Sequence, residues 1–289
     1  MSSDVFIQIF FNGLMLGLML SMIAVGLTLV FGIMHIVNLA HGEIYMLGGF
    51  GIWILFAKLN INFIVSLVIT AALVGFFGAL IERFLFKPFR GNLLPSMIVS
   101  IGIILILQTS ALLIFGIMDK PVPTPGNLEG TMDIYGAILS VERLIIIIIA
   151  AISVVSLFLF IRFTKPGKSM RAVADDQVAA ALQGVDIDRT CSICMFIGCG
   201  LAGVAGSLMG CLFYVNSQMG ATPFMKALVV LVLGGMGSII GTILGAFIIG
   251  FVESTASTFI SGPVAHLLIF LVLVIVLLVR PRGLFGHEE

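Results

Sequence analysis

The sequence from residue 144 to residue 189 reads LIIIIIAAISVVSLFLFIRFTKPGKSMRAVADDQVAAALQGVDIDR. Its first part, 144–163, is almost wholly apolar, and about 20 such residues cross a bilayer as a helix. The second part, 164–189, is the longest strongly polar run of the chain. A membrane helix that leads into a structured, charged internal loop indicates a loop kept for a partner in water.

The composition extends this interpretation to the whole chain. It has 289 residues, of which 60% are hydrophobic and 10% charged, whereas soluble domains are about 25% charged. Long apolar runs predict an all-α polytopic membrane protein, a single transmembrane domain over 1–289, with about eight transmembrane helices plus re-entrant or broken Gly-rich segments. The remaining apolar segments are 6–33, 44–56, 63–86, 93–118, 191–214, 227–258 and 264–279.

Lysine and arginine predict the orientation, because they are enriched in cytoplasmic loops. They cluster at 83–90, at 165–171 and after residue 279, whereas 119–143 carries more acidic residues than basic ones. We therefore expect 86–92, the loop 164–190 and the C-terminus inside, with 119–143 and the N-terminus outside. The N-terminal residues lack the basic region of a signal peptide, so we expect no cleavage there.

Glycines concentrate where this topology requires an irregular path. The segment 227–258 must begin and end outside, and about 32 residues are too few for two full spans. We therefore expect a re-entrant pair or two short broken helices, with Gly234, Gly235, Gly237 and Gly241 as candidates for lining the pathway. A similar interruption occurs at 32–49. Interrupted segments in two halves are typical of transporters, and the alternative is that the glycines permit close helix packing.

The loop 164–190 contains a helical pattern. Apolar residues recur at i, i+3 and i+4 spacing over 170–184, with Ser169 as a possible cap and Gly184 as a helix end. This pattern predicts one short amphipathic helix at the cytoplasmic surface. The alternative is an interfacial anchor, but anchors favour Lys, Arg and Trp, and this helix carries alanines and two adjacent aspartates. A protein docking surface is favoured.

A polar cluster interrupts the first two apolar segments. Asn38, His41 and Tyr45 follow i+3 and i+4 spacing, which places them on one helical face, and Glu43 lies beside them. Polar groups at membrane depth suggest function, and the alternative is a loop at the cytoplasmic interface. Because neither HExxH nor GxSxG occurs, we expect gating or packing, with no catalytic residue.

Other polar residues carry less information. Lys226 and Glu253 are expected near the outer face, Lys226 as a solvated side chain and Glu253 as either a partner contact or a solvated group. The four cysteines lie in one apolar segment with no second ligand pair, so we expect no metal site. Zero net charge indicates no nucleic-acid partner. The chain has no Walker A sequence, and few acidic residues lie within its apolar segments, which favours an external motor over an ion gradient.

Five motifs resemble one known family, the permease subunits of ABC importers for branched-chain and other hydrophobic amino acids. They are GLTLVFG (26–32), NLAHGEIYMLGG (38–49), RAVADD (171–176), GGMGSIIG (234–241) and RPRGLFG (280–286). The likeness covers nearly the whole chain, which resembles the shorter of the two permeases.

The resemblance implies ATP-driven uptake of leucine, isoleucine and valine across a bacterial or archaeal cytoplasmic (inner) membrane. It implies a second homologous permease, an external substrate-binding protein and two cytoplasmic ATPases that hold ATP and magnesium, so that this chain carries no cofactor. The loop 164–190 is then similar to a coupling loop, although Val178 stands where such importers often carry glutamate. The implied ATPase-docking residues are Arg171, Asp175, Asp176, Ala179, Ala180 and Gly184.

Three alternatives remain open. Urea and short-chain amide permeases share these motifs, so the cargo can differ within the class. A stand-alone channel or ion-coupled carrier is a different class, and the charged helix at 170–184 argues against it. An intramembrane enzyme lacks a nucleophile and base pair.

Overall fold

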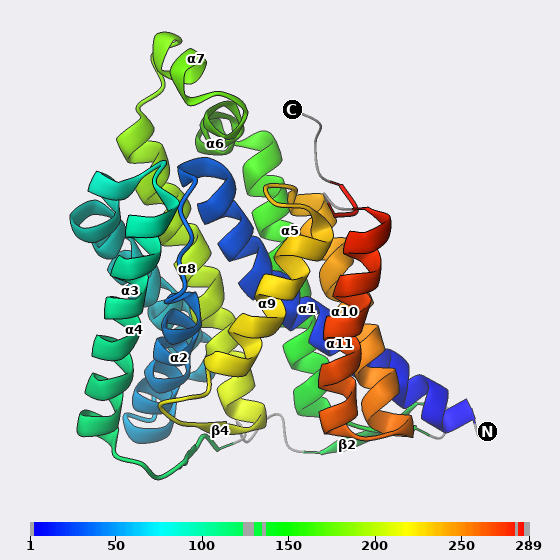
Figure 1. Cartoon of the computed structure of the whole chain (residues 1–289). Helices are drawn as coiled ribbons and strands as arrows, with labels where there is room; N and C mark the ends of the chain where they lie inside the picture. Colours follow the sequence, from blue (N-terminus) through cyan, green and yellow to red (C-terminus); the bar gives the residue numbers. More distant parts are fainter. Residues whose placement is uncertain (1–2, 124–129, 135–136, 281–282, 286–289) are drawn as a thin grey trace.

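The computed structural model describes residues 3–123, 130–134, 137–280 and 283–285. They form a helical bundle with short strands at one end (Figure 1). The elements are α1 (Ser3–Met34), α2 (His41–Ile52), η1 (Trp53–Lys58), α3 (Phe63–Ile81), η2 (Glu82–Phe86), η3 (Lys87–Phe89), α4 (Leu93–Phe115), β1 (Lys120–Pro121), β2 (Thr131–Ile134), β3 (Ala137–Ser140), α5 (Val141–Phe163), α6 (Lys165–Asp175), α7 (Gln177–Leu182), α8 (Ile187–Leu212), β4 (Tyr214–Val215), α9 (Ala221–Gly234), α10 (Ile239–Phe259) and α11 (Gly262–Val279). Two antiparallel pairs, β1–β4 and β2–β3, account for these strands.

Seven of the described helices are long and apolar enough to cross a membrane, and α9 is a shorter apolar helix. This confirms the all-α polytopic class, with seven long helices where about eight were expected. The second apolar segment is split between α2 and the π-helix η1, so neither part reaches the length of a full span. A π-turn of this kind widens the helix locally and is often found at functional sites.

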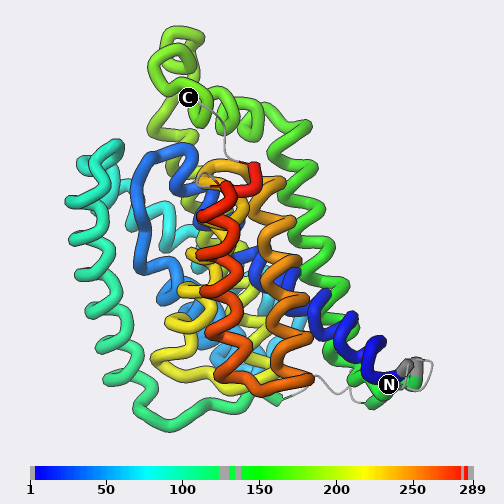
Figure 2. Tube along the Cα trace, turned by 45° about the vertical axis from the view of Figure 1, so that its right-hand side comes forward, coloured from blue at the N-terminus to red at the C-terminus, as the bar shows by residue number. Residues whose placement is uncertain are grey.

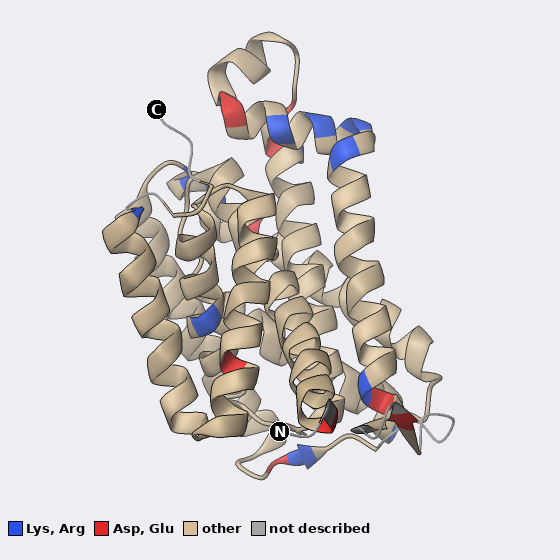
Figure 3. Cartoon of the chain, turned by 90° about the vertical axis from the view of Figure 1, so that its right-hand side faces the viewer, with Lys and Arg blue, Asp and Glu red and all other residues tan. Residues whose placement is uncertain are grey.

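The two ends of the bundle differ in what they carry. The start of α1 and the strands lie at one end, and α6, α7 and the last described residues lie at the other, in both views (Figures 1 and 2). Most lysine, arginine, aspartate and glutamate residues also gather at these two ends (Figure 3). The predicted grouping of 119–143 with the N-terminus, opposite the loop 164–190 and the C-terminus, therefore agrees with the structure as far as the described residues extend.

The chain folds as two halves that run in opposite directions. In each half a long helix, α1 or α8, is followed by a non-helical segment, a short helix, α2 or α9, and then a long helix, α3 or α10. The two halves also pack symmetrically: the first long helix of each half contacts the last long helix of the other, α1 with α10 and α8 with α3. Inverted repeats of this type place binding sites at the interface between the halves.

The glycine-rich region departs from the sequence-based expectation in one respect. A break does separate two helices, because α9 ends at Gly234 and α10 begins at Ile239. However, only α9 is short; α10 has 21 residues, enough for a full span. The break forms because Gly235 and Gly237 adopt φ values of 98° and 91°, which residues with a side chain rarely adopt.

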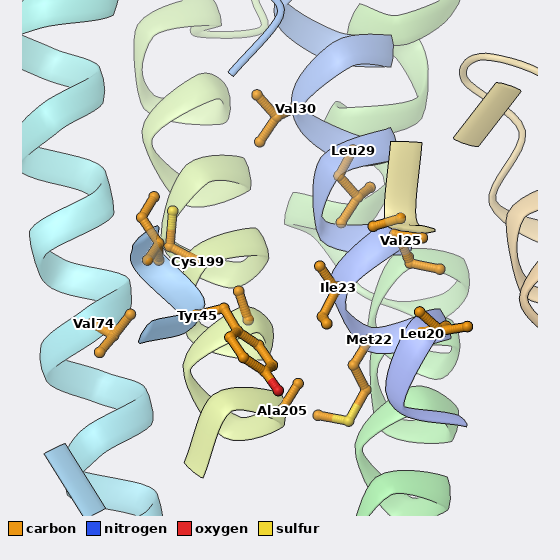
Figure 4. Packing of buried hydrophobic residues seen from close by; sticks show 14 of the residues in the cluster. Leu20, Met22, Ile23, Val25, Leu29, Val30, Tyr45, Val74, Cys199 and Ala205 are labelled. Carbon is orange, nitrogen blue, oxygen red and sulfur yellow. The ribbon is translucent and has the colours of Figure 1, made fainter. Parts of the chain in front are cut away.

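Helix α1 lies at the centre of the core. Met22, Ile23 and Val30 of α1 are at most 2% exposed. Figure 4 shows Tyr45 of α2 and Ala205 of α8 beside this helix. Backbones approach closely here, since a Cβ atom added at Gly206 would overlap the Tyr45 carbonyl oxygen. Small residues that permit such contact are the usual means of packing membrane helices.

The C-terminal motif closes the end of α9. The amide of Leu284 donates to the Leu233 carbonyl at 2.8 Å, and that of Phe285 donates to the Gly234 carbonyl at 3.1 Å. Two of the last carbonyls of the helix, which have no partner within the helix, are thereby satisfied. Residues 281, 282 and 286 of the motif lie outside the described residues.

Candidate functional site

The predicted polar cluster lies inside the bundle, at the start of α2. Asn38, His41 and Tyr45 are at most 1% exposed, and Glu43 is 4% exposed. The interpretation as a loop at the membrane surface is therefore wrong. The shared helical face is also wrong, because α2 begins at His41 and leaves Asn38 before the helix. The Asn38 side chain accepts a hydrogen bond from the Ala40 amide at 3.1 Å, a local turn that competes with helix formation.

Several polar atoms of this cluster lack partners. Nδ2 of Asn38, both ring nitrogens of His41 and Oε2 of Glu43 are buried without a hydrogen bond in the described structure. Glu43 Oε1 accepts from Gln108 of α4 at 2.8 Å, a partner that the sequence did not single out because it lies 65 residues away. Buried polar groups are nearly always satisfied, so this cluster is unusual within the described part of the bundle.

We expect His41→Ala to lower transport more than it lowers expression. The His41 ring fills space against Gly26 of α1 and makes no hydrogen bond of ordinary geometry, so its loss removes contacts rather than a hydrogen bond. Loss of a buried side chain typically costs about 0.5–3 kcal/mol, enough to shift the balance between two conformations. Uptake rate divided by the amount of inserted protein measures the effect, and a wild-type ratio would contradict it.

We expect Gly237→Leu to abolish transport with a modest loss of expression. Its φ of 91° makes any side chain strained there, and residues 237 and 238 form the connection into α10. Ala246→Gly is the control, because Ala246 is buried in the middle of α10. This change measures the general cost of altering the helix, about 1 kcal/mol. Normal uptake by Gly237→Leu would show that the shape of this break is unimportant.

The loop 164–190 contains two helices, whereas one was predicted. Thr164 caps α6 by accepting the Gly167 amide at 3.1 Å, so α6 starts before Ser169, and proline is tolerated in the first turn. Asp176 then interrupts the pattern. Its backbone is extended, and its side chain accepts the amides of Val178 and Ala179 at 2.8 and 3.0 Å, which starts α7.

The predicted docking residues are mostly exposed at this end of the bundle. Arg171, Asp175, Asp176, Ala179 and Gly184 are exposed, and Ala180 is buried. The predicted apolar face, however, is divided: Met170 and Val173 of α6 are buried, whereas Val178 and Leu182 of α7 are 71% and 82% exposed. Helix α7 therefore presents apolar side chains away from the bundle. Exposed apolar groups of this kind mark interaction sites.

This loop is connected directly to the core helices. Nε2 of Gln177 in α7 donates to the carbonyl of Ile33, near the end of α1, at 2.7 Å. A cavity of about 720 Å³ lies beside α6, between α1, α5 and the break at 235–238, with Gly32, Lys168 and Gly237 among its lining residues. The cavity therefore leaves space beside α6, and Gln177 connects α7 to the end of α1.

An ion-pair network joins the end of α3 to the start of α8. Arg90 bonds to the Glu82 carboxylate and, at 2.6 Å, to Asp188. Lys87 also contacts Asp188 at 2.5 Å, and Ser192 donates to Glu82 at 2.7 Å. Glu82 is fully buried. The sequence analysis used these cations only for orientation, because their partners lie on a distant helix.

A second ion pair lies between α9 and α10. Lys226 Nζ is 2.5 Å from Glu253 Oε1, and the side chains are 15% and 12% exposed. The interpretation of Lys226 as a solvated side chain is therefore wrong. Charged pairs within membrane helices are costly and usually functional. The two residues are separated by 27 positions, so only the antiparallel packing of α9 and α10 brings them together.

Comparison with known proteins identifies the family. Residues 9–278 match the family described as the branched-chain amino acid transport system permease component. A high-affinity branched-chain amino acid transport system permease protein, LivH of Salmonella typhimurium, is 35% identical over 98% of this chain and 96% of its own length. BraD of Pseudomonas aeruginosa, which carries the same description, is 33% identical over 98% and 97%.

A solved structure supports the fold alone. PsaBC from Streptococcus pneumoniae in complex with Fab aligns with a TM-score of 0.51 at 16% identity, covering 94% of this chain and 91% of that one. The family match, the two relatives and the seven apolar helices all indicate a membrane permease. This multi-pass membrane protein belongs to the family of branched-chain amino acid transport system permease components, and it is a transport subunit rather than an enzyme.

Proposed function

We propose that this chain is the permease subunit through which an ATP-driven importer takes up leucine, isoleucine and valine. The family and the printed function of its relatives support this substrate class. The observation that carries the ATP-driven mechanism is helix α7, whose apolar residues Val178 and Leu182 project from the bundle while Gln177 bonds to the end of α1. An ATPase that moves α7 would thereby move the core.

The proposed complex contains a second homologous permease, two ATPases and an external substrate-binding protein. ATP and magnesium are held and used by the ATPases. Within this chain, α6 and α7 transmit the motion through Gln177 to α1 and through Asp188 to α3, while the breaks before α2 and between α9 and α10 supply the movable segments. Half-helices and non-helical backbone at membrane depth are characteristic of alternating-access transporters.

The proposed orientation places α6, α7 and the C-terminus in the cytoplasm and the N-terminus outside, in a bacterial or archaeal inner membrane. We expect an impermeant thiol reagent to label a single cysteine at Met118, which is 75% exposed, in intact cells. A cysteine at Lys168 should react only after the membrane is opened. The reverse pattern would invert the topology.

Uptake and co-purification test the function. The tagged chain, expressed with its neighbouring genes, should retain two ATPase subunits and import radiolabelled leucine only when ATP is available. Import of urea or a short amide in place of leucine would change the cargo within the class. Leucine transport by the purified chain alone, without ATPases, would instead support a channel or an ion-coupled carrier.

A further inference from the structure

The groove between α9 and α11 carries polar side chains at membrane depth. Thr222, Lys226 and His266 line a cavity of about 270 Å³ there. Glu253, which pairs with Lys226, lies six residues before the end of α10 at Phe259, about 9 Å along the helix at 1.5 Å per residue. Because charged groups facing lipid are unfavourable, we expect this groove to face water or another protein.

The cavity has two kinds of lining. Thr222, Lys226 and His266 supply polar groups, whereas Met225, Ile269 and Phe270 supply an apolar wall. Its volume falls just below the range of about 300–1,000 Å³ that drug-sized ligands occupy. The dimensions and lining therefore fit a small molecule with one charged end and a compact apolar tail.

Lys226 has unused capacity to bind such a ligand. Its ammonium group carries three donors, and the described structure uses one of them, in the bond to Glu253. Lys226 lines the cavity, whereas Glu253 does not. Glu253 Oε2 is buried without a hydrogen bond. Glu253 therefore pairs with Lys226 from outside the cavity, and the remaining two ammonium donors of Lys226 are free to bind a carboxylate inside it.

We propose that this cavity binds the transported amino acid by its carboxylate, with Lys226 as the carboxylate partner. Met225, Ile269 and Phe270 receive the branched side chain. The identity of the ligand rests on the proposed function, whereas the preference for a carboxylate with an apolar tail rests on the cavity alone. The competing explanation is that Lys226 and Glu253 only fasten α9 to α10.

Exchange of the two charges separates these explanations. In the double variant Lys226→Glu with Glu253→Lys, an ion pair can still join the helices, but a carboxylate now lines the cavity. A fastening role predicts unchanged binding and stability. The proposed site predicts normal stability with a loss of carboxylate affinity of roughly tenfold to a hundredfold, since hydrogen bonds to charged groups contribute about 1.5–3 kcal/mol. Lys226→Arg should largely retain binding.

The measurement is equilibrium binding of radiolabelled L-leucine to the purified full-length chain without the binding protein. Competition by 4-methylpentanoate, which has the carboxylate alone, is expected, and isopentylamine, which has the ammonium alone, should not compete. The proposal is overturned if the exchanged variant binds as the wild type does, or if the chain binds neither carboxylate while cells still import leucine. Lys226-dependent binding of 4-methylpentanoate without leucine import would retain the site and reject the proposed function.

Discussion

Replacing Glu82 with alanine is expected to destabilise the bundle by about 1–3 kcal/mol, because Arg90 loses its buried partner and keeps only the more exposed Asp188. Glu82 is fully buried, and its partner Arg90 has a side chain only 14% exposed. Ser192 of α8 also loses its acceptor. The change therefore weakens the packing of α3 on α8, which is one of the most extensive contacts of the fold. Thermal unfolding of the purified protein measures the loss.

Lys87→Ala is the matched control. It removes the other cation of the same network, but the side chains of Lys87 and Asp188 are 48% and 55% exposed, and exposed pairs contribute about 0–1 kcal/mol. Equal destabilisation by the two variants would show that burial of Glu82 does not set the strength of this network.

If α7 docks the proposed ATPases, replacing Leu182 with aspartate is expected to abolish uptake and release them, while the chain still inserts and folds. Leu182 is 82% exposed and projects from α7, so the change adds no buried charge to the isolated chain. In a docked complex the same side chain would be desolvated, and an unpaired buried charge costs several kcal/mol. Co-purified ATPase per permease and leucine uptake are the two measurements.

Leu182→Met is the control, since it keeps the surface apolar and such exchanges cost less than about 1.5 kcal/mol even in cores. The adjacent alanines sharpen the test. Ala179 is exposed, so Ala179→Leu acts at the docking surface, whereas Ala180 is 4% exposed and Ala180→Leu overpacks α7 itself. Full ATPase retention by Leu182→Asp would exclude α7 as the docking helix.

The candidate site was only partly predictable. The motif NLAHGEIYMLGG identified Asn38, His41 and Glu43, because polar residues are conspicuous in an apolar chain. Their burial inside the bundle was not predictable, since it depends on the path of 35–40 back between the helices. Gln108, the partner of Glu43, gave no signal, because a single glutamine in an apolar helix has no local pattern.

The docking loop shows the limits of periodicity. The i, i+3, i+4 pattern over 170–184 predicted one helix with one buried face, but a single Asp176 cap divides it. Periodicity reports which residues can share a face, whereas the direction in which each helix points depends on packing. Val178 and Leu182 consequently belong to an exposed surface, although they fit the same i, i+3, i+4 pattern as the buried Met170 and Val173.

By itself the sequence determined the membrane class, the positions of the long helices, the two ends of the bundle and the break among the glycines, because hydrophobicity, charge and glycine act over short stretches of chain. The tertiary structure decided which distant residues meet. The bonds of Asp188 to Lys87 and Arg90 form only because the two halves pack together. The Lys226–Glu253 pair and the cavity beside it form only because α9 packs against α10 and α11. Such contacts depend on helix rotation and register, which no local pattern in the sequence encodes.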